Sequence, residues 1–385
     1  MTIWMALPAA AVCVSLLYYA AATVAAIRFA RRTTSPILPI PKIAPRVAVL
    51  KPLHGTSNSL AANLISFLEI AYPRADFYFG VENYEDAAAE VPVAIRQRYQ
   101  YASITLVVGE EPGCSNHKIA KLIKMADRAE KAEIFVLSDA DVSVERDYLR
   151  RIVGELASDE KIGIVTCAYR ARPSGSFASR LEALYVNTDF LPQLLLAETI
   201  EPMHYALGAT IAIKRHALEA AGGFRAVKDM LADDFCIGNL ANAQGYRIKL
   251  SDSIVTLTCE EKSFAEFWHH QLRWARTYRI VRPISIATIL THGPFWALML
   301  LAISRGSAAA VAALVLVVAA RLAMAAAIAS RVLKTPQMLR ELWMVPIKDL
   351  IMTGVWFTSL LSNKVSWGGR RFQVIRSGAM REVKN

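Results

Sequence analysis

The hydrophobic and polar positions of the chain divide it into three regions. Residues 3–27 contain no charged side chain, and a run of that length is long enough to span a bilayer. From residue 46 onward, short apolar runs alternate with amphipathic segments, and from residue 284 to residue 362 long apolar stretches return. The pattern predicts a folded domain held between membrane segments.

The middle region alternates predicted strands with predicted helices. We expect strands at 47–50, 77–81, 104–108, 134–137, 162–166, 206–213 and 248–257, and helices at 59–70, 86–99, 117–131, 177–198, 215–221 and 230–244. This order predicts an α/β fold with a mainly parallel sheet and helices on both faces. There is no G-x-G-x-x-G after the first strand and no G-x-x-x-x-G-K-[ST], so the dinucleotide-binding and P-loop folds lack their main support.

Two aspartates follow the fourth predicted strand directly. The apolar run 134–137 continues into S-D-A-D at residues 138–141, which places Asp139 and Asp141 at the carboxyl end of a strand, where ligands bind in α/β sheets. Their hard oxygen atoms suit Mg²⁺ or Mn²⁺ bridging to substrate phosphates. A D-x-D sequence alone is more often a solvated turn, so this hypothesis depends on the preceding strand and on the charged motifs downstream.

Residues 263–283 have the pattern of an amphipathic helix that Pro283 ends. Four arginines recur every three residues, apart from an aromatic and aliphatic face: Arg273, Arg276, Arg279 and Arg282. Such a helix suits the membrane surface. The alternative is a solvated basic face on an ordinary surface helix.

Three further apolar stretches predict membrane helices at 284–303, 307–330 and 343–362. Arg321 in the second stretch is costly in lipid, so we expect it to snorkel or to face another helix. The third stretch contains Lys348 and Asp349. If it crosses the membrane as well, the tail of the chain lies outside, and if it is interfacial the tail stays inside.

Basic charge lies beside the apolar segments. The formal net charge is +11; residues 28–51 contain basic but no acidic side chains, and the tail from Lys364 is also basic. The positive-inside rule places the N-terminus outside and residue 28 onward in the cytoplasm. These runs suggest anionic lipids rather than nucleic acid as a partner. The five cysteines include no C-x-x-C pair, which argues against a zinc site and suits a reducing cytosol.

These observations divide the chain into six parts. They are an N-terminal transmembrane anchor (1–28), a linker (29–45), a cytosolic α/β domain (46–262), an amphipathic interfacial helix (263–283), C-terminal membrane helices (284–363) and a basic tail (364–385).

Six short motifs resemble those of the ceramide glucosyltransferase family, over about residues 47–283. V-L-K-P-L-H-G at 49–55 resembles its opening, E-N-Y-E-D at 82–86 its first aspartate motif, N-H-K at 116–118 its N-x-K segment, S-D-A-D at 138–141 its second aspartate motif, D-D at 233–234 its third, and H-Q-L-R-W at 270–274 its final motif. The resemblance implies a membrane-bound, inverting glycosyltransferase of GT-A fold with a nucleotide-sugar donor and a lipid acceptor.

One motif departs from the family pattern, because His270 stands where the family has Gln or Arg. The H-x-x-R-W form looks closer to a bacterial branch whose members glycosylate hopanoid polyols with UDP-N-acetylglucosamine. The resemblance to that branch implies a multi-pass protein of a bacterial inner membrane. It leaves both donor and acceptor open.

The resemblance also implies roles for individual residues. Asp234 would be the general base that takes the proton of a lipid hydroxyl; without the match, Asp233 and Asp234 are helix caps. Asp139 and Asp141 would hold the metal ion, and Asp139 would also contact the donor. The remaining donor contacts would be Asp86 to the nucleobase or ribose and Lys118 and Arg273 to the phosphates, with Trp274 stacking on the sugar or acceptor. For Asp86 and Lys118 the plain alternatives are a helix cap and a surface charge.

The preferred reaction is transfer of glucose from UDP-glucose to ceramide. The alternatives are transfer of N-acetylglucosamine to a hopanoid polyol, a processive polysaccharide synthase, and a membrane-anchored binding protein without activity. A synthase usually needs more membrane spans than this chain offers, and a binding protein has no chemical need for Asp139, Asp141, Asp234 and Arg273 together. The sequence does not distinguish ceramide, hopanoid and diacylglycerol acceptors, nor does it indicate the oligomeric state or which divalent ion is used.

Overall fold

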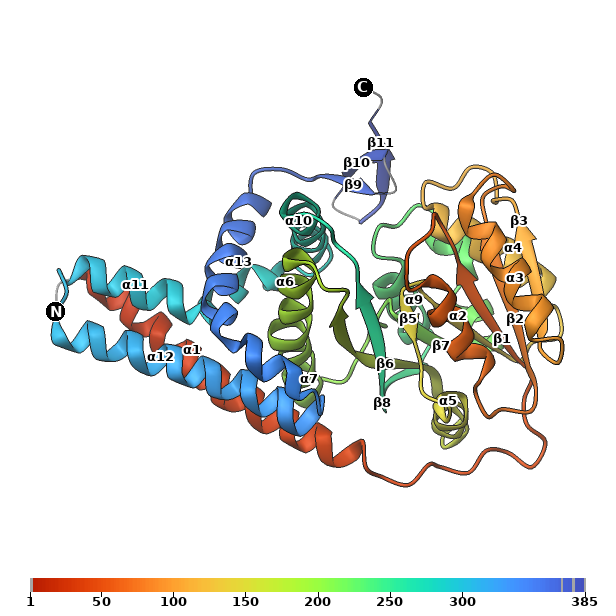
Figure 1. The fold of residues 1–385 in the computed structure, drawn as a ribbon, viewed down its shortest axis with the longest axis horizontal. Helices are drawn as coiled ribbons and strands as arrows, with labels where there is room; N and C mark the ends of the chain where they lie inside the picture. The colour runs from red at the N-terminus through yellow and green to blue at the C-terminus, as the bar shows by residue number, and fades with distance from the viewer. Residues whose placement is uncertain (1–2, 368–369, 376–377, 384–385) are drawn as a thin grey trace.

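The computed structural model describes residues 3–367, 370–375 and 378–383. It has an α/β part and a helical part, and α1 (Ile3–Arg32) joins α11 (Gly293–Ile303) and α12 (Ala308–Ala327) in an arm that projects away from the sheet (Figure 1). Helix α1 continues past the expected boundary at residue 28. The segment between Arg32 and β1 then runs without regular structure to the sheet, as the prolines predicted.

The α/β part is built on an eight-stranded sheet with the order β3-β2-β1-β4-β7-β6-β8-β5. Its strands are β1 (Val47–Pro52), β2 (Ala75–Val81), β3 (Ser103–Val108), β4 (Ile134–Ser138), β5 (Val142–Ser143), β6 (Ile162–Pro173), β7 (Thr210–Lys214) and β8 (Arg247–Cys259). Strands β3, β2, β1 and β4 pair in parallel, as do β6 and β8, whereas β7 and β5 are antiparallel to their neighbours. The predicted mainly parallel sheet is therefore confirmed.

Helices cover this sheet. They are α2 (Leu60–Leu68), α3 (Glu90–Arg98), α4 (His117–Arg128), α5 (Tyr148–Ala157), α6 (Phe177–Tyr185), α7 (Leu191–Ile200), α8 (Arg215–Ala220) and α9 (Asp233–Ala243), with short 3₁₀ turns η1 (Ala87–Ala89) and η3 (Phe224–Val227). The pattern did not predict α5. The expected helix 177–198 is interrupted by a π-helical segment, η2 (Val186–Phe190). The expected strand 206–213 is shorter, because residues 205–209 form a wall of the cavity described below.

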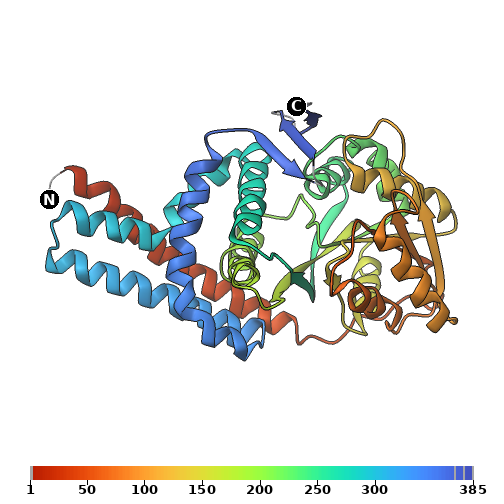
Figure 2. The same ribbon diagram turned by 45° about the horizontal axis from the view of Figure 1, so that its top comes forward.

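The helical part continues from α10 (Phe264–Val281) through η4 (Pro283–Thr291), α11, α12, a π-helical segment η5 (Ile328–Val332), η6 (Pro336–Met344) and α13 (Val345–Ser359). By length and composition α1 and α12 can each cross a membrane, and η4 with α11 makes a third candidate that is bent by 59°. Figure 2 shows α13 running across the base of the arm. Arg321 is buried and pairs with Asp189 and Asp349, which confirms that it faces other parts of the chain.

The C-terminal tail has a structure that the sequence did not predict. It forms a separate sheet of β9 (Lys364–Trp367), β10 (Arg370–Val374) and β11 (Met380–Glu382). The sheet buries Val365, Phe372 and Met380 against Leu231 of the α/β part. Two of the tail's basic residues, Arg376 and Lys384, lie outside the described residues.

Candidate active site

A cavity of about 1200 Å³ lies between the carboxyl edge of the sheet and the helical part. Its walls come from the ends of β1 and β4, the segments 205–209 and 231–235, helix α10, the η4 turn and α13. The cavity is larger than most small-molecule sites, which measure roughly 300–1,000 Å³. It therefore has room for more than one substrate group.

A buried lysine fixes the turn that carries the aspartate pair. The ammonium of Lys51, near the carboxyl end of β1, donates to the carbonyl oxygens of Asp139 (2.8 Å) and Val142 (3.2 Å) and lies 3.9 Å from the ring centroid of Phe67. Burial lowers the pKa of Lys51 to about 7. Lys51 thus donates to two backbone carbonyls and to the Ser138 hydroxyl. These hydrogen bonds hold the bend in the chain after β4, and both aspartates face the cavity.

The two aspartates differ in their partners. Asp139 Oδ1 accepts from the Lys118 ammonium at 2.8 Å, whereas Asp141 has no ion-pair partner within 4.0 Å among the described residues. Burial, together with the charge of Asp139, raises the pKa of Asp141 to about 7. Asp141 is therefore a carboxylate that faces the cavity, has a second carboxylate beside it and has no ion-pair partner among the described residues. Such a group is a suitable ligand for a hard divalent cation.

Lys118 joins the aspartate pair to the start of α9. Its ammonium lies 2.8 Å from Asp139 Oδ1 and 3.4 Å from Asp233 Oδ2. Although burial opposes the charge, Asp139 and Asp233 hold the pKa of Lys118 above its ordinary value. The lysine is placed by Asn116, whose side chain caps α4 by accepting from the Ile119 N–H at 3.1 Å. Lys118 is therefore a cavity residue and not a free surface charge.

Asp234 lies at the first turn of α9 and faces the same cavity. Its Oδ1 accepts from the Phe235 N–H at 2.8 Å. Burial and then the charge of Asp233 raise its pKa to about 6. A side chain at Gly208 would start 2.9 Å from Asp234 Oδ2, so the glycine leaves the carboxylate its place. A carboxylate with this pKa can accept a proton at neutral pH.

Arg273 projects from α10 into the cavity without a carboxylate partner. Burial lowers its pKa, and no acidic oxygen of the described chain lies within 4.0 Å of its guanidinium. Arg273 is half-buried, and a cation partly removed from water without a direct counterion favours binding of an anion. The site therefore needs an anion from a ligand, and a guanidinium matches phosphate oxygens in a bidentate way.

The other arginines of α10 do not form one solvated or lipid-facing strip. The guanidinium of Arg276 donates to the Lys364 carbonyl, and that of Arg279 donates to the Ser362 carbonyl at 3.1 Å. Arg282 pairs with Glu201. The predicted basic face is thus largely used to hold the chain that leads into the C-terminal sheet.

His270 is held as a cation beside this helix. Its Nδ1 lies 3.0 Å from Glu182 Oε1 and 3.5 Å from Glu261 Oε1. Although burial opposes the charged form, the two glutamates raise the pKa of His270 to about 9. The ligand atoms of these three residues lie within 4.8 Å of one another. The imidazolium offsets one of the two negative charges, and the Gln271 amide also donates to Glu182 at 2.8 Å.

Aromatic rings separate the charged end of the cavity from the membrane helices. Trp274 of α10 lies 6.0 Å from Phe190 and 6.2 Å from Tyr278, and Phe190 stacks on Tyr169 at 4.7 Å, between ring centroids. All four rings line the cavity. Trp274 therefore lines the cavity among other aromatic rings, and its contact with a sugar or an acceptor stays a prediction.

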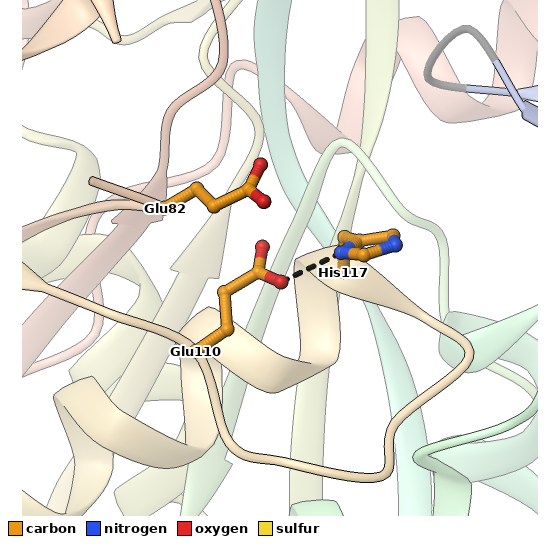
Figure 3. Close-up of side chains that lie close together, drawn as sticks. All are labelled: Glu82, Glu110 and His117. Carbon is orange, nitrogen blue, oxygen red and sulfur yellow. Dashed lines mark hydrogen bonds and ion pairs between the residues drawn. The ribbon is translucent and has the colours of Figure 1, made fainter. Parts of the chain in front are cut away.

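Asp86 does not line the cavity. Its Oδ1 accepts from the N–H groups of Ala88 and Gly55, both at 2.9 Å, so it caps η1 and fixes the loop after β1. Three other side chains meet near the ends of β2 and β3: Glu82, Glu110 and His117, with His117 Nδ1 2.6 Å from Glu110 Oε2 (Figure 3). Glu82 and His117 line the cavity, and they offer the polar contacts that the sequence assigned to Asp86.

The charged site residues that sequence reasoning named and that line the cavity are Lys118, Asp139, Asp141, Asp234 and Arg273. It missed others that line it, among them Glu82 and Asp189, and it missed Lys51, which holds the turn after β4 from outside the cavity lining. The lysine that directly follows the apolar run 47–50 was a signal for a buried polar contact, because a lysine buried in a strand needs hydrogen-bond acceptors. Glu82 stood in a quoted motif, but the motif drew attention to Asp86. Asp189 lies in the predicted helix 177–198, where nothing in the pattern distinguished it.

The model of the family described as Glycosyl transferase family 21 matches residues 7–380 of the chain. Ceramide glucosyltransferase 3 of Caenorhabditis elegans is 24% identical over 232 residues, 60% of this chain and 50% of that protein. A poly-beta-1,6-N-acetyl-D-glucosamine synthase of Staphylococcus aureus is 18% identical over 60% of this chain and 54% of that protein. The chain thus spans about half the length of the curated relatives it matches.

Among solved structures, the chain resembles a mannosyltransferase of Pyrobaculum calidifontis in complex with GDP-Man and Mn²⁺. The TM-score is 0.53 at 22% sequence identity, and the match covers 92% of this chain and 99% of that one. The likeness shows the fold, which is that of the GT-A glycosyltransferases.

Proposed function

Because this chain belongs to Glycosyl transferase family 21, we propose that it transfers a hexosyl group from a UDP-sugar to a hydroxyl of a membrane lipid. UDP-glucose and ceramide are the first candidates for donor and acceptor. The observation that carries the proposal is that one cavity holds an unpaired cation, Arg273, an unpaired carboxylate, Asp141, and a carboxylate of raised pKa, Asp234.

The charged end of the cavity suits the donor. Arg273 and Lys118 would contact the pyrophosphate, whose negative charge grows as the bond to the anomeric carbon breaks. Glu82 and His117 would contact the nucleobase or ribose. Asp86 would act indirectly, since it fixes the Gly55 loop that lines the cavity.

A divalent cation, Mg²⁺ or Mn²⁺, fits Asp139 and Asp141, because Asp141 has no ion-pair partner among the described residues and Asp139 uses Oδ1 alone for Lys118. When bound, it would neutralise phosphate charge and favour departure of UDP. Lys51 would keep the turn in place by holding the Asp139 carbonyl.

Asp234 would act as the general base. A lipid hydroxyl is a weak nucleophile at neutral pH, and a carboxylate with a pKa of about 6 is ionised there and can take the proton as the oxygen attacks. Attack from the side opposite the leaving UDP inverts the anomeric carbon. The fact that Asp234 lines the same cavity as Lys118 and Tyr278 supports this role.

The acceptor would enter from the membrane. The cavity extends to η4 and α13, and the chain has two or three segments able to cross a bilayer. We place the α/β part in the cytoplasm by the distribution of basic residues, and the whole protein in the inner membrane of a bacterium.

A polysaccharide synthase is the second candidate, which the likeness to the poly-beta-1,6-N-acetyl-D-glucosamine synthase favours. A growing polymer needs a channel through the membrane. The cavity reaches the membrane helices, but the two or three candidate spans found among the described residues make a narrow basis for such a channel.

The proposal is tested with a donor panel. The purified protein in nanodiscs is given Mg²⁺ or Mn²⁺, a lipid extract and each UDP-sugar in turn, and products are identified by mass. A single sugar on ceramide or on a hopanoid polyol supports the proposal and identifies the branch. A polymer supports the synthase, and no transfer from any UDP-sugar contradicts both.

A further inference from the structure

The membrane end of the cavity presents a charged side chain. Asp189 of η2 lines the cavity there, together with Tyr18 of α1, His292 at the bend before α11 and Met352 of α13. The side chain of Asp189 is 20% exposed. The hydroxyl of Tyr18 has no hydrogen-bond partner among the described residues. The hydroxyl itself is buried, so Asp189 is the polar group that this end of the cavity exposes.

Asp189 belongs to a network whose other charged members are hidden. Arg321 Nη2 donates to Asp189 Oδ1 at 3.1 Å, and Lys348 pairs with Oδ2. Arg321 and Lys348 are 3% and 0% exposed and also pair with Asp349, which is 7% exposed. Those three residues do not line the large cavity, so Asp189 is the member of this network that a ligand there meets.

The carboxylate of Asp189 has acceptor capacity left. Arg321 and Lys348 donate to it, and the Thr188 hydroxyl, whose one proton is shared between the Leu184 carbonyl (2.7 Å) and Oδ2 (2.9 Å), makes at most a third donor. A carboxylate has about four acceptor sites. Two of its partners are the cations Arg321 and Lys348, and at least one acceptor site remains for a donor from the cavity.

The surroundings indicate that a lipid supplies this donor. Isoleucines that line the cavity are also exposed at its rim: Ile200 at 74%, Ile284 at 71% and Ile286 at 43%. An apolar rim beside membrane helices suits hydrocarbon chains. Charged residues at membrane depth commonly mark the path of a substrate.

We propose that Asp189 selects the acceptor lipid by accepting a hydrogen bond from an N–H or O–H group behind the reacting hydroxyl. This inference rests on the proposed function. An ionised carboxylate only accepts, so it favours the amide and second hydroxyl of a ceramide, or the hydroxyls of a polyol. It disfavours a diacylglycerol, whose ester groups also only accept and which has a single hydroxyl. Buried polar groups left unpaired make such discrimination strong.

The test measures lipid binding without a sugar donor. The protein in nanodiscs is offered ceramide and diacylglycerol of equal chain length, and retained lipid is measured by native mass spectrometry. We expect ceramide to be retained at least about tenfold better. In Asp189→Asn the new amide can donate to an ester carbonyl, so this preference falls about tenfold. Equal retention by the unmodified protein, or an unchanged preference in Asp189→Asn, overturns the proposal.

Asp349→Asn is the matched control, because it removes the same charge from the same network without facing the large cavity. It should lower the thermal stability to a similar extent and leave the lipid preference unchanged. An equal shift in both variants overturns the proposal. If Asp189→Asn does not fold, the unmodified protein is offered an N-methylated 3-deoxyceramide, which has no donor besides the reacting hydroxyl, and equal retention of this lipid and ceramide overturns it.

The assay also separates this inference from the proposed function. Retention is measured without nucleotide sugar, so it reports on Asp189 even if no UDP-sugar is transferred. Absence of transfer with a clear ceramide preference refutes the reaction alone, whereas transfer without any preference refutes the role of Asp189 alone.

Discussion

The carboxylates of the cavity differ in their surroundings, and this difference separates their proposed roles. Asp139 and Asp233 are held by the Lys118 ammonium. Asp234 is stabilised by one backbone N–H and has a pKa of about 6. An aspartate that is already paired with a lysine is a poor proton acceptor, so Asp234 is the better candidate for the base.

The pH dependence of transfer follows from this pKa. Burial raises the pKa of Asp234 from its ordinary value to about 6, and a base must be unprotonated to act. The rate should therefore rise with pH and level off above pH 6, and at pH 5 it should be about tenfold below the plateau. Initial rates at low donor concentration check this. A rate that is flat or falls between pH 5 and 7 would exclude Asp234.

At the scale of single residues, the sequence predicted which side chains meet at the cavity better than it predicted the contacts of those side chains. The D-x-D, D-D and R-W motifs identified side chains that the fold brings to one cavity. The role of Asp86 was harder to predict, since a carboxylate after a strand can equally cap a turn or bind a ligand. In this structure it caps η1. Glu182 and Glu261, which hold His270, lie far from it in the sequence, and no local pattern could pair them.

Helix α10 links the cavity, the membrane helices and the tail. Arg273 faces the cavity, Arg276 and Arg279 hold the chain before and within β9, and Arg282 pairs with Glu201 of the segment after α7. A repeat of three residues places successive arginines at neighbouring but different angles on a helix. The basic face was therefore predictable, whereas its division among three partners was not.

Loss of one arginine should release the C-terminal sheet. In Arg279→Ala the hydrogen bonds to Ser362 and Asn363 are removed, at a cost of about 1 kcal/mol each. We expect faster hydrogen exchange of residues 364–374. Arg381→Ala, an exposed change on β11, is the control and should leave exchange unchanged. Equal exchange in Arg279→Ala and the unmodified protein would mean that α10 does not hold the tail.

Other elements show what a pattern of apolar residues does and does not specify. The apolar strands 47–50 and 134–137 were predicted because they are buried on both faces. The stretch 284–303 was predicted as one helix but bends by 59° where η4 meets α11. The apolar run alone does not specify this bend, but Gly293-Pro294 at the start of α11 was a signal for a break in the helix.

The whole molecule fits three passages through a membrane. The N-terminus and the turn between α11 and α12 lie at the same end of the arm (Figures 1 and 2). The tail contacts the α/β part, since the Leu231 N–H donates to the Gly378 carbonyl at 3.0 Å and the Met380 N–H to the Asp229 carbonyl at 2.7 Å. We therefore infer that the segment 343–362 does not cross and that the tail lies on the side of the α/β part.

Labelling of single cysteines checks this arrangement. Ala308→Cys, at the start of α12, should react with a membrane-impermeant maleimide in intact cells. Ser366→Cys in β9 should react only after the membrane is opened. The unmodified chain gives the background of its own five cysteines. Labelling of Ser366→Cys in intact cells would reverse the proposed orientation.

The most direct test of the account compares chemistry and binding in Asp234→Asn. The variant and the unmodified protein are supplied with the UDP-sugar and lipid that the donor panel identifies, and product formation in a single turnover is measured beside the affinity for the UDP-sugar. The account predicts that product falls at least about a hundredfold, the scale of general-base catalysis, while the affinity for the donor is kept. Transfer at an undiminished rate would contradict it.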